Sequence, residues 1–208
     1  MRLIQFAVLL FSFNLFAFEG VITYSQTDLK DGKQIPSITK SLSAYFYDDL
    51  LVRLKIEYDS SKFKISSQDI YLSHAKGTVV RIETPGKTYS QSELDKSVKP
   101  NVMPSKQTVE KTILNHKTSL YTFPDKYSAV KTKLYYSESL KMKPQPYLLS
   151  GLGSMSWALN PETGAVAMMI HMYLDKDSER IIEVTKIEAK KLKPAEYLPK
   201  LQGYSLKN

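Results

Sequence analysis

The chain contains no cysteine, which excludes a disulfide framework, a lipid-modified cysteine and a metal site built on thiolates. Histidine is also scarce. His74, His116 and His171 stand alone in the sequence, with none of the spacings found in metal-binding motifs. The Gly-Leu-Gly at 151–153 lacks the third glycine and the lysine of a nucleotide-binding loop. The sequence therefore predicts no catalytic residues, no metal and no cofactor, and we expect a protein that is not an enzyme.

The acidic side chains form no convincing catalytic or metal site either. Asp48 and Asp49 are adjacent and mark a turn, where carboxylates are usually solvated. Asp175, Asp177 and Glu179 alternate in another turn. They could hold a cation loosely, although a polar hairpin is the simpler interpretation.

The amino-terminal residues have the pattern of a secretory signal. Arg2 supplies a positive charge, and an almost entirely apolar stretch follows, with Ala17 as a small residue at a possible cleavage site. We therefore expect a cleaved signal peptide at residues 1–17, a single domain at 18–208 and a periplasmic location. The alternative is a membrane anchor, because the apolar run is only slightly short of a spanning helix.

The formal net charge of +8 favours anionic partners such as a phosphate-bearing membrane surface or an acidic protein. Nucleic acid is not expected as a partner, because the lysines are scattered and the protein is predicted to be exported. A well-solvated surface with no specific partner explains the same charge. We expect the protein to be a monomer.

Short alternating segments bounded by turn residues dominate the chain, and 14 Tyr and 8 Phe suit strands. A capping-box pattern at Ser90 and Glu93 predicts one short helix over 91–98. We predict a mainly β fold: a curved antiparallel sheet forming an open half barrel, with one or two short helices as a lid or plug. The predicted strands are 20–27, 41–47, 52–58, 63–73 (a strand pair or one bent strand), 78–83, 106–115, 117–123, 129–136, 165–174 and 179–190.

Two neighbouring segments late in the chain are unusually apolar. Residues 144–161 carry no charge, and 165–174 are apolar on both faces of the predicted strand. A strand of this kind is covered on both sides, so we expect a helix, a ligand or both inside the curve of the sheet. Leucine and methionine recur at helical spacing in the first segment, although Gly151 and Gly153 would weaken such a helix.

These segments supply the predicted ligand site. Methionine is flexible and polarizable, and a lining rich in it suits acyl chains, which need shape tolerance and no hydrogen bonds. The alternative is an ordinary hydrophobic core. The predicted lining of the apolar cavity is Leu148, Leu152, Met155, Trp157, Met168, Met169 and Tyr173.

Several short stretches resemble an exported bacterial family known as domain-of-unknown-function family 4412. They are the start of the predicted domain at 18–22, then 112–121, 134–140, 184–187 and the proline-terminated tail at 192–199. In the second stretch, Asn115, His116 and Thr118 stand where the family carries Gly, Tyr and Cys. The family's half barrel is similar to the lipoprotein carriers LolA and LolB. The resemblance implies an apolar cavity under a helical lid, no catalytic residues, and binding of lipid, acyl groups or a docking protein.

We therefore expect a soluble periplasmic protein that binds an apolar ligand without catalysis. The ligand would be a lipid or the acyl chains of a lipoprotein, so that the partner is a lipid or an acylated protein. The alternative is a protein–protein interaction module of the cell envelope that uses a sheet edge or a basic face. A complex of that second kind should be sensitive to salt.

Overall fold

The computed structural model describes residues 18–123, 131–149 and 151–207. The signal peptide predicted for residues 1–17 lies outside the described residues, as does the start of the strand predicted over 129–136. No helix in the described ranges is long and apolar enough to cross a membrane.

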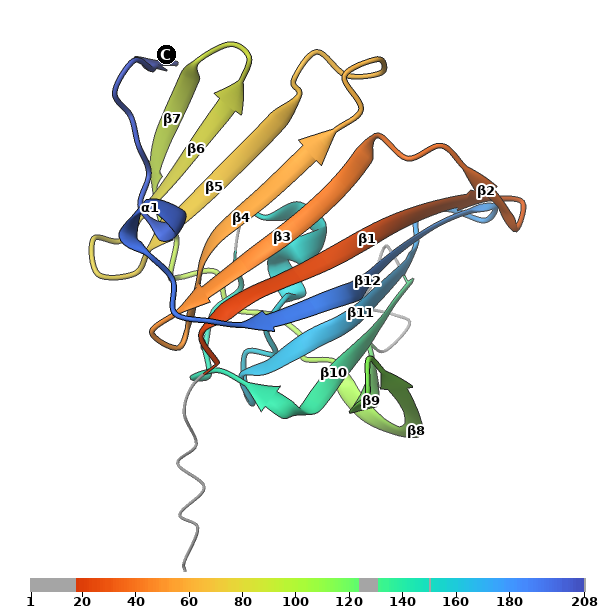
Figure 1. Ribbon diagram of the computed structural model, residues 1–208. Helices are drawn as coiled ribbons and strands as arrows, with labels where there is room; N and C mark the ends of the chain where they lie inside the picture. Colours follow the sequence, from red (N-terminus) through yellow and green to blue (C-terminus); the bar gives the residue numbers. More distant parts are fainter. Residues whose placement is uncertain (1–17, 124–130, 150, 208) are drawn as a thin grey trace, which may run out of the picture.

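The described residues form one 13-stranded sheet that curves without closing (Figure 1), which confirms the predicted mainly β half barrel. Its spatial order is β13-β7-β6-β5-β4-β3-β1-β12-β11-β10-β9-β8, and β2 pairs with β1 beside this path. The strands are β1 Gly20–Lys30, β2 Lys33–Ile35, β3 Thr39–Tyr47, β4 Leu50–Tyr58, β5 Ser67–Ser73, β6 Thr78–Thr84, β7 Thr88–Glu93, β8 Ser105–Ile113, β9 His116–Thr122, β10 Lys131–Lys141, β11 Ala165–Tyr173, β12 Ser178–Ala189 and β13 Ser205–Leu206.

The first and the last long strands lie side by side in the middle of the sheet. β1 and β12 pair antiparallel from Gly20 with Ala189 to Lys30 with Ser178. Neighbouring pairs of strands are antiparallel except at one edge, where β13 runs parallel to β7. The pairing of the two long strands joins both ends of the domain, so the half barrel is built around them.

The concave face of the sheet carries the main core. Leu42, Ala44 and Phe46 alternate with polar residues along β3 and are buried, as the period-2 pattern predicts. Ile22 on β1 packs in the same cluster, where each large apolar side chain contributes about 1.5–3 kcal/mol by leaving water. Alternation of this kind fixes which face of the sheet turns inward.

The segment between β10 and β11 fills the concave side. It contains a single turn of 3-10 helix, η2 (Gly153–Trp157), which lies behind the sheet in Figure 1. Gly151 and Gly153 have φ angles of 80° and 55°, in the left-handed region, so no regular α-helix extends across them. The predicted plug is therefore present, in a shorter form than the helical spacing suggested.

The helix predicted over 91–98 is wrong. Ser90 and Gln91 lie in β7, where they pair with Arg81 and Val80 of β6. The capping box is a local pattern worth about 1 kcal/mol, and the six-residue ladder with β6 outweighs it. Tertiary pairing decides the conformation here.

The residues after β12 cross the opposite, convex face of the sheet. We call residues 192–206 the C-terminal strap. It contains the short helix α1 (Pro194–Tyr197), which lies in front of the sheet in Figure 1, and ends with β13. Arg53 donates from Nη1 to the carbonyl oxygen of Glu196 at 2.9 Å, and the amide of Leu192 donates to the Glu19 carboxylate at 2.6 Å. These contacts hold the strap against the sheet.

Candidate binding site: an apolar groove under the C-terminal strap

The structure brings five of the seven predicted cavity residues together. Leu152, Met155, Met168 and Met169 belong to the main core cluster and are buried, with Met168 fully inaccessible. Trp157 packs against this cluster and makes an edge-to-face contact with Phe123, with ring centroids 4.9 Å apart. The apolar character predicted for this region is therefore present on the concave side of the sheet.

The other two predicted residues lie apart from this cluster. Tyr173 stacks on His171, with ring centroids 4.4 Å apart, and accepts a hydrogen bond from Lys133 Nζ at 3.0 Å. Strand alternation places both rings on the face opposite Ile170. Leu148 is half-buried and donates its amide to the Val98 carbonyl oxygen. The ligand-lining role of the seven residues remains a prediction.

A pocket that sequence reasoning missed lies on the convex face, between the sheet and the strap. This groove has a volume of about 430 Å3. Val52, Tyr71 and Val80 form its floor on β4, β5 and β6, while Leu198 and Leu201 contribute to its roof. The remaining lining comes from the two adjacent turns, neighbouring strand residues and the strap: Tyr47, Asp48, Leu50, Leu72, Ser73, His74, Ala75, Lys76, Thr78, Gln91, Tyr197 and Pro199.

The floor is apolar because β6 carries apolar residues on both faces. Val79 joins the main core, while Val80 and Ile82 point to the convex face and pack with Tyr71, which pairs with Val80. Arg81, between them, faces the concave side and donates from Nη2 to the carbonyl oxygen of Gly151. Consecutive valines at 79–80 were the sequence signal for a second covered face.

A β-bulge adds one more apolar residue to the floor. Phe46 of β3 pairs with Leu51 and Tyr45 pairs with Arg53, so that Val52 between them is unpaired. Leu51 consequently joins the main core and Val52 lines the groove. Strict alternation along the strand predicted over 52–58 would put Val52 on the same face as Leu54, and the bulge is the reason for the difference.

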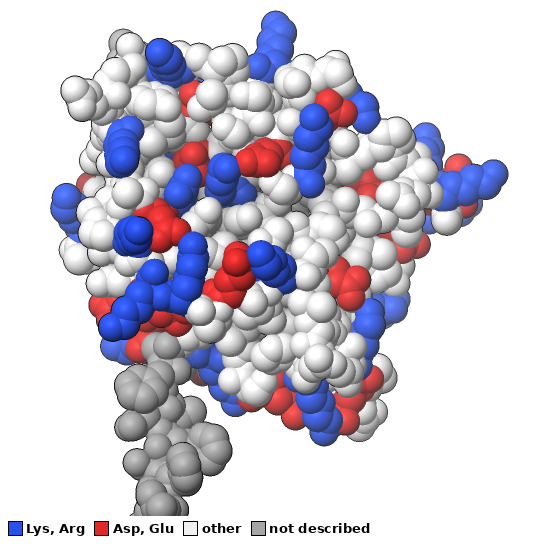
Figure 2. Space-filling view, in the orientation of Figure 1, with Lys and Arg blue, Asp and Glu red and all other residues white. Residues whose placement is uncertain are grey.

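The strap contributes apolar and aromatic side chains of its own. Leu201 and Tyr204 pack against the convex-face cluster of Tyr71, Val80 and Ile82. Leu198 stays 52% exposed at the edge of the groove. Over the rest of the convex face, basic and acidic side chains are interspersed (Figure 2), so the apolar groove contrasts with its surroundings.

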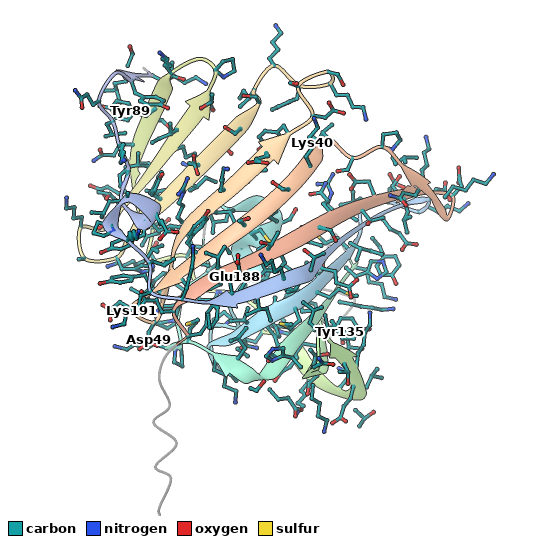
Figure 3. The ribbon with its side chains drawn as sticks, in the orientation of Figure 1. Lys40, Asp49, Tyr89, Tyr135, Glu188 and Lys191 are labelled. Carbon is teal, nitrogen blue, oxygen red and sulfur yellow. The ribbon has the colours of Figure 1, made fainter. Side chains whose placement is uncertain are left out.

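A second pocket adjoins the groove at the turn between β3 and β4. It has a volume of about 410 Å3 and shares Asp48, Leu50 and His74 with the groove. Asp49, whose position at this turn is labelled in Figure 3, and Lys143 also line it. Its remaining lining is the start of the segment that fills the concave side: Pro144, Gln145, Pro146 and Tyr147.

His74 stands at the junction of the two pockets. Its Nδ1 lies 2.5 Å from the Tyr147 hydroxyl, in a hydrogen bond whose direction depends on the tautomer. Burial lowers the pKa of His74 below its usual value of 6.5. A backbone contact to Leu51 opposes this, and the nearby positive charge of Lys96 adds a smaller lowering. The imidazole of His74 is therefore neutral at pH 7. Burial also raises the pKa of its partner, Tyr147.

The other two histidines lie far from the groove along the sheet. His116 Nδ1 is 3.0 Å from Ser139 Oγ, and His171 Nε2 is 2.7 Å from Glu179 Oε2. Within the described ranges no group of three or more His, Asp or Glu side chains is arranged to hold a metal ion. What the groove and its neighbour offer is an apolar volume with a few polar groups at one end.

No family model matches this chain, and no curated protein is similar to it in sequence. Solved structures do share its fold. A structure of PNGF-II in space group P21 is 11% identical over 90% of this chain and 31% of that chain, with a TM-score of 0.51. A second PNGF-II structure, in space group C2, is 10% identical over 90% and 30%, with a TM-score of 0.50.

The chain therefore spans less than a third of the length of these PNGF-II chains. At such low identity the likeness concerns the fold alone.

Proposed function

We propose that the protein is a non-catalytic binding protein for an apolar ligand, which it holds in the groove under the C-terminal strap. The observation that carries this proposal is the groove itself. Its volume of about 430 Å3 lies within the usual range for ligand sites, and its floor and roof are mostly aliphatic and aromatic.

An acyl chain fits the chemistry of this lining. Burying each methylene contributes about 0.8 kcal/mol, so roughly ten methylenes supply about 8 kcal/mol, which corresponds to micromolar binding. The ligand would be a lipid or an acyl chain of a lipoprotein. The periplasmic location, the monomeric state and the LolA/LolB-like role belong to the same proposal.

The concave-side cluster is the other place where such a ligand could lie. Leu152, Met155 and Met168 would line it, and its occupation requires the segment around η2 to move. The groove is preferred because it is already open in the structure.

Displacement of a fluorescent fatty acid tests the proposal. Wild-type protein should take up the probe at micromolar concentration. Val80→Trp, which fills the floor of the groove, should weaken uptake at least tenfold. Val109→Trp is the matched control, because Val109 lies on β8 and is 50% exposed, away from the groove. Lack of uptake by the wild type would reject the function, and equal uptake by Val80→Trp would reject the groove as its site.

A sheet edge supports the second candidate function, an envelope interaction module. β8 ends the strand order of the described residues and pairs there with β9 alone. Val109 and Lys106 are exposed on it, and such an edge can accept an added strand from a partner. Co-purification of a partner that dissociates at high salt, and is lost when Val109 is replaced by Pro, would favour this function.

A further inference from the structure

The groove and the adjoining pocket are neighbours, and together we call them the recess. They share Asp48, Leu50 and His74 along their common boundary. The groove extends from this boundary beneath the strap, and the second pocket extends the other way, toward Lys143 and Tyr147. An elongated molecule lying across Asp48, Leu50 and His74 would reach both pockets.

The two halves of this recess differ in polarity. Apolar side chains line the half beneath the strap, including Val52, Val80 and Leu201. Charged side chains gather at the other half, where Asp48, Asp49 and Lys143 line the adjoining pocket and Lys76 stands at the end of the groove. This division matches an amphiphile with one apolar chain and one polar head group.

The four charged groups have no partner among the described residues. In the part of the chain that the structure describes, no hydrogen bond or ion pair engages the carboxylates of Asp48 and Asp49 or the ammonium groups of Lys76 and Lys143. Arg53, on the same convex face, is by contrast paired with Asp69 at 2.7 Å. The charges around the recess are therefore available to a ligand.

We infer that the recess binds a single-chain amphiphile with a zwitterionic head group that carries an amine and a phosphate. This inference rests on the proposed function and specifies its ligand. The amine would lie against Asp48 and Asp49, and the phosphate would lie against Lys143 or Lys76. An anionic head group without an amine would pair with a lysine but leave both carboxylates without a cationic partner, so we expect it to bind less tightly.

Replacing both aspartates by asparagine tests the head-group preference without altering the turn. Asp48 and Asp49 have φ angles of 51° and 62°, and asparagine tolerates this left-handed region well. Asp31→Asn is a matched control, because Asp31 also has a φ of 51° in a turn but lines neither pocket.

The measurement compares three competitors of equal chain length for displacement of the fluorescent fatty acid. They are lysophosphatidylethanolamine, lysophosphatidylglycerol and a free fatty acid. Wild type and Asp31→Asn should bind the first at least tenfold more tightly than the other two. The Asp48→Asn/Asp49→Asn variant should bind all three within about threefold of one another.

The outcomes separate the two proposals. If all three competitors bind the wild type equally, or if the double variant keeps the preference, the head-group inference is overturned while the apolar site stands. If the wild type binds no acyl compound, the proposed function itself fails.

Discussion

The rings of Tyr47 and Tyr197 stack with their centroids 4.2 Å apart and their planes 12° apart. Tyr47 ends β3 and Tyr197 ends α1, so the contact joins the sheet to the C-terminal strap. Both side chains also line the groove. The stacked pair therefore links the sheet side of the groove to the strap that forms its roof.

Replacing Tyr197 by Ala should loosen the strap. A stacked aromatic pair contributes about 0.5–1.5 kcal/mol beyond its buried area, so the free energy of unfolding should fall by about 1 kcal/mol or more. Hydrogen exchange should accelerate at backbone amides of residues 194–206 and stay unchanged in β1 and β12. Phe63→Ala is the control, since Phe63 contacts Tyr58 far from the strap. Unchanged exchange in the strap would contradict the role of the pair.

Arg53 anchors the strap from beneath. Its Nε and Nη2 donate to the Asp69 carboxylate at 2.8 and 2.7 Å, while Nη1 donates to the Glu196 carbonyl oxygen at 2.9 Å. The guanidinium also lies over the rings of Tyr45 and Tyr71, 4.8 and 5.1 Å from their centroids. Five donors in a rigid plane make these contacts possible at once.

Arg53→Lys should therefore be destabilising although it keeps the charge. A lysine cannot reproduce the forked contacts, and we expect a loss of about 1–3 kcal/mol in the free energy of unfolding, measured with urea. Arg81→Lys is the comparison, because within the described ranges Arg81 makes one hydrogen bond, to the Gly151 carbonyl oxygen. An Arg53→Lys protein as stable as its Arg81→Lys counterpart would contradict the anchoring role.

Most of the fold was predicted from the alternation of apolar and polar side chains along the strands. Leu42, Ala44 and Phe46 of the strand predicted over 41–47 lie on one buried face, as their alternation with polar residues predicts. Patterns of this kind are local and therefore visible in the sequence. The helix expected at 91–98 failed because Gln91 pairs with Val80 in a hairpin, and that ladder outweighs the local capping pattern.

The groove was less accessible to sequence reasoning. Its floor depends on a bulge that turns Val52 outward, and its roof depends on where the C-terminal strap packs on the sheet. A bulge and a long-range docking contact leave no periodic signature. The outward-facing Val80 was visible, because Val79 and Val80 make β6 apolar on both faces, and the same argument that was applied to β11 applies there.

Asp28 gives the stability a predicted dependence on pH. It is buried, and burial alone would raise its pKa, but hydrogen bonds from Arg180, Gln26 and Ser37 outweigh that effect and lower the pKa below 3.8. Arg180 Nε lies 2.7 Å from Asp28 Oδ1. Because the folded-state pKa is the lower one, the stabilisation is present above about pH 4 and is lost as the pH falls through the folded pKa.

Asp28→Asn should consequently cost about 1.5–3 kcal/mol at pH 7, the usual contribution of hydrogen bonds to a charged group. The difference from wild type should shrink when urea unfolding is repeated near pH 3, where Asp28 of the unfolded wild type is protonated. Asp177→Asn is the control, because Asp177 is exposed in the β11–β12 turn. A difference of the same size at both pH values would show that the charge of Asp28 is not its cause.

Replacing Met155 distinguishes the two candidate ligand sites, the concave-side core and the groove. Its side chain is 2% exposed and packs in the main cluster, whereas it lines neither the groove nor the adjoining pocket. Met155→Ala should lower the free energy of unfolding by about 2–5 kcal/mol, because the cavity it leaves is only partly filled by relaxation. Met103→Ala, at a half-buried position outside that cluster, should cost less. Under conditions in which the variant stays folded, affinity for the fluorescent fatty acid should remain within about twofold of wild type if the groove is the site. A marked change in affinity would instead place the ligand on the concave side, among Leu152, Met155 and Met168.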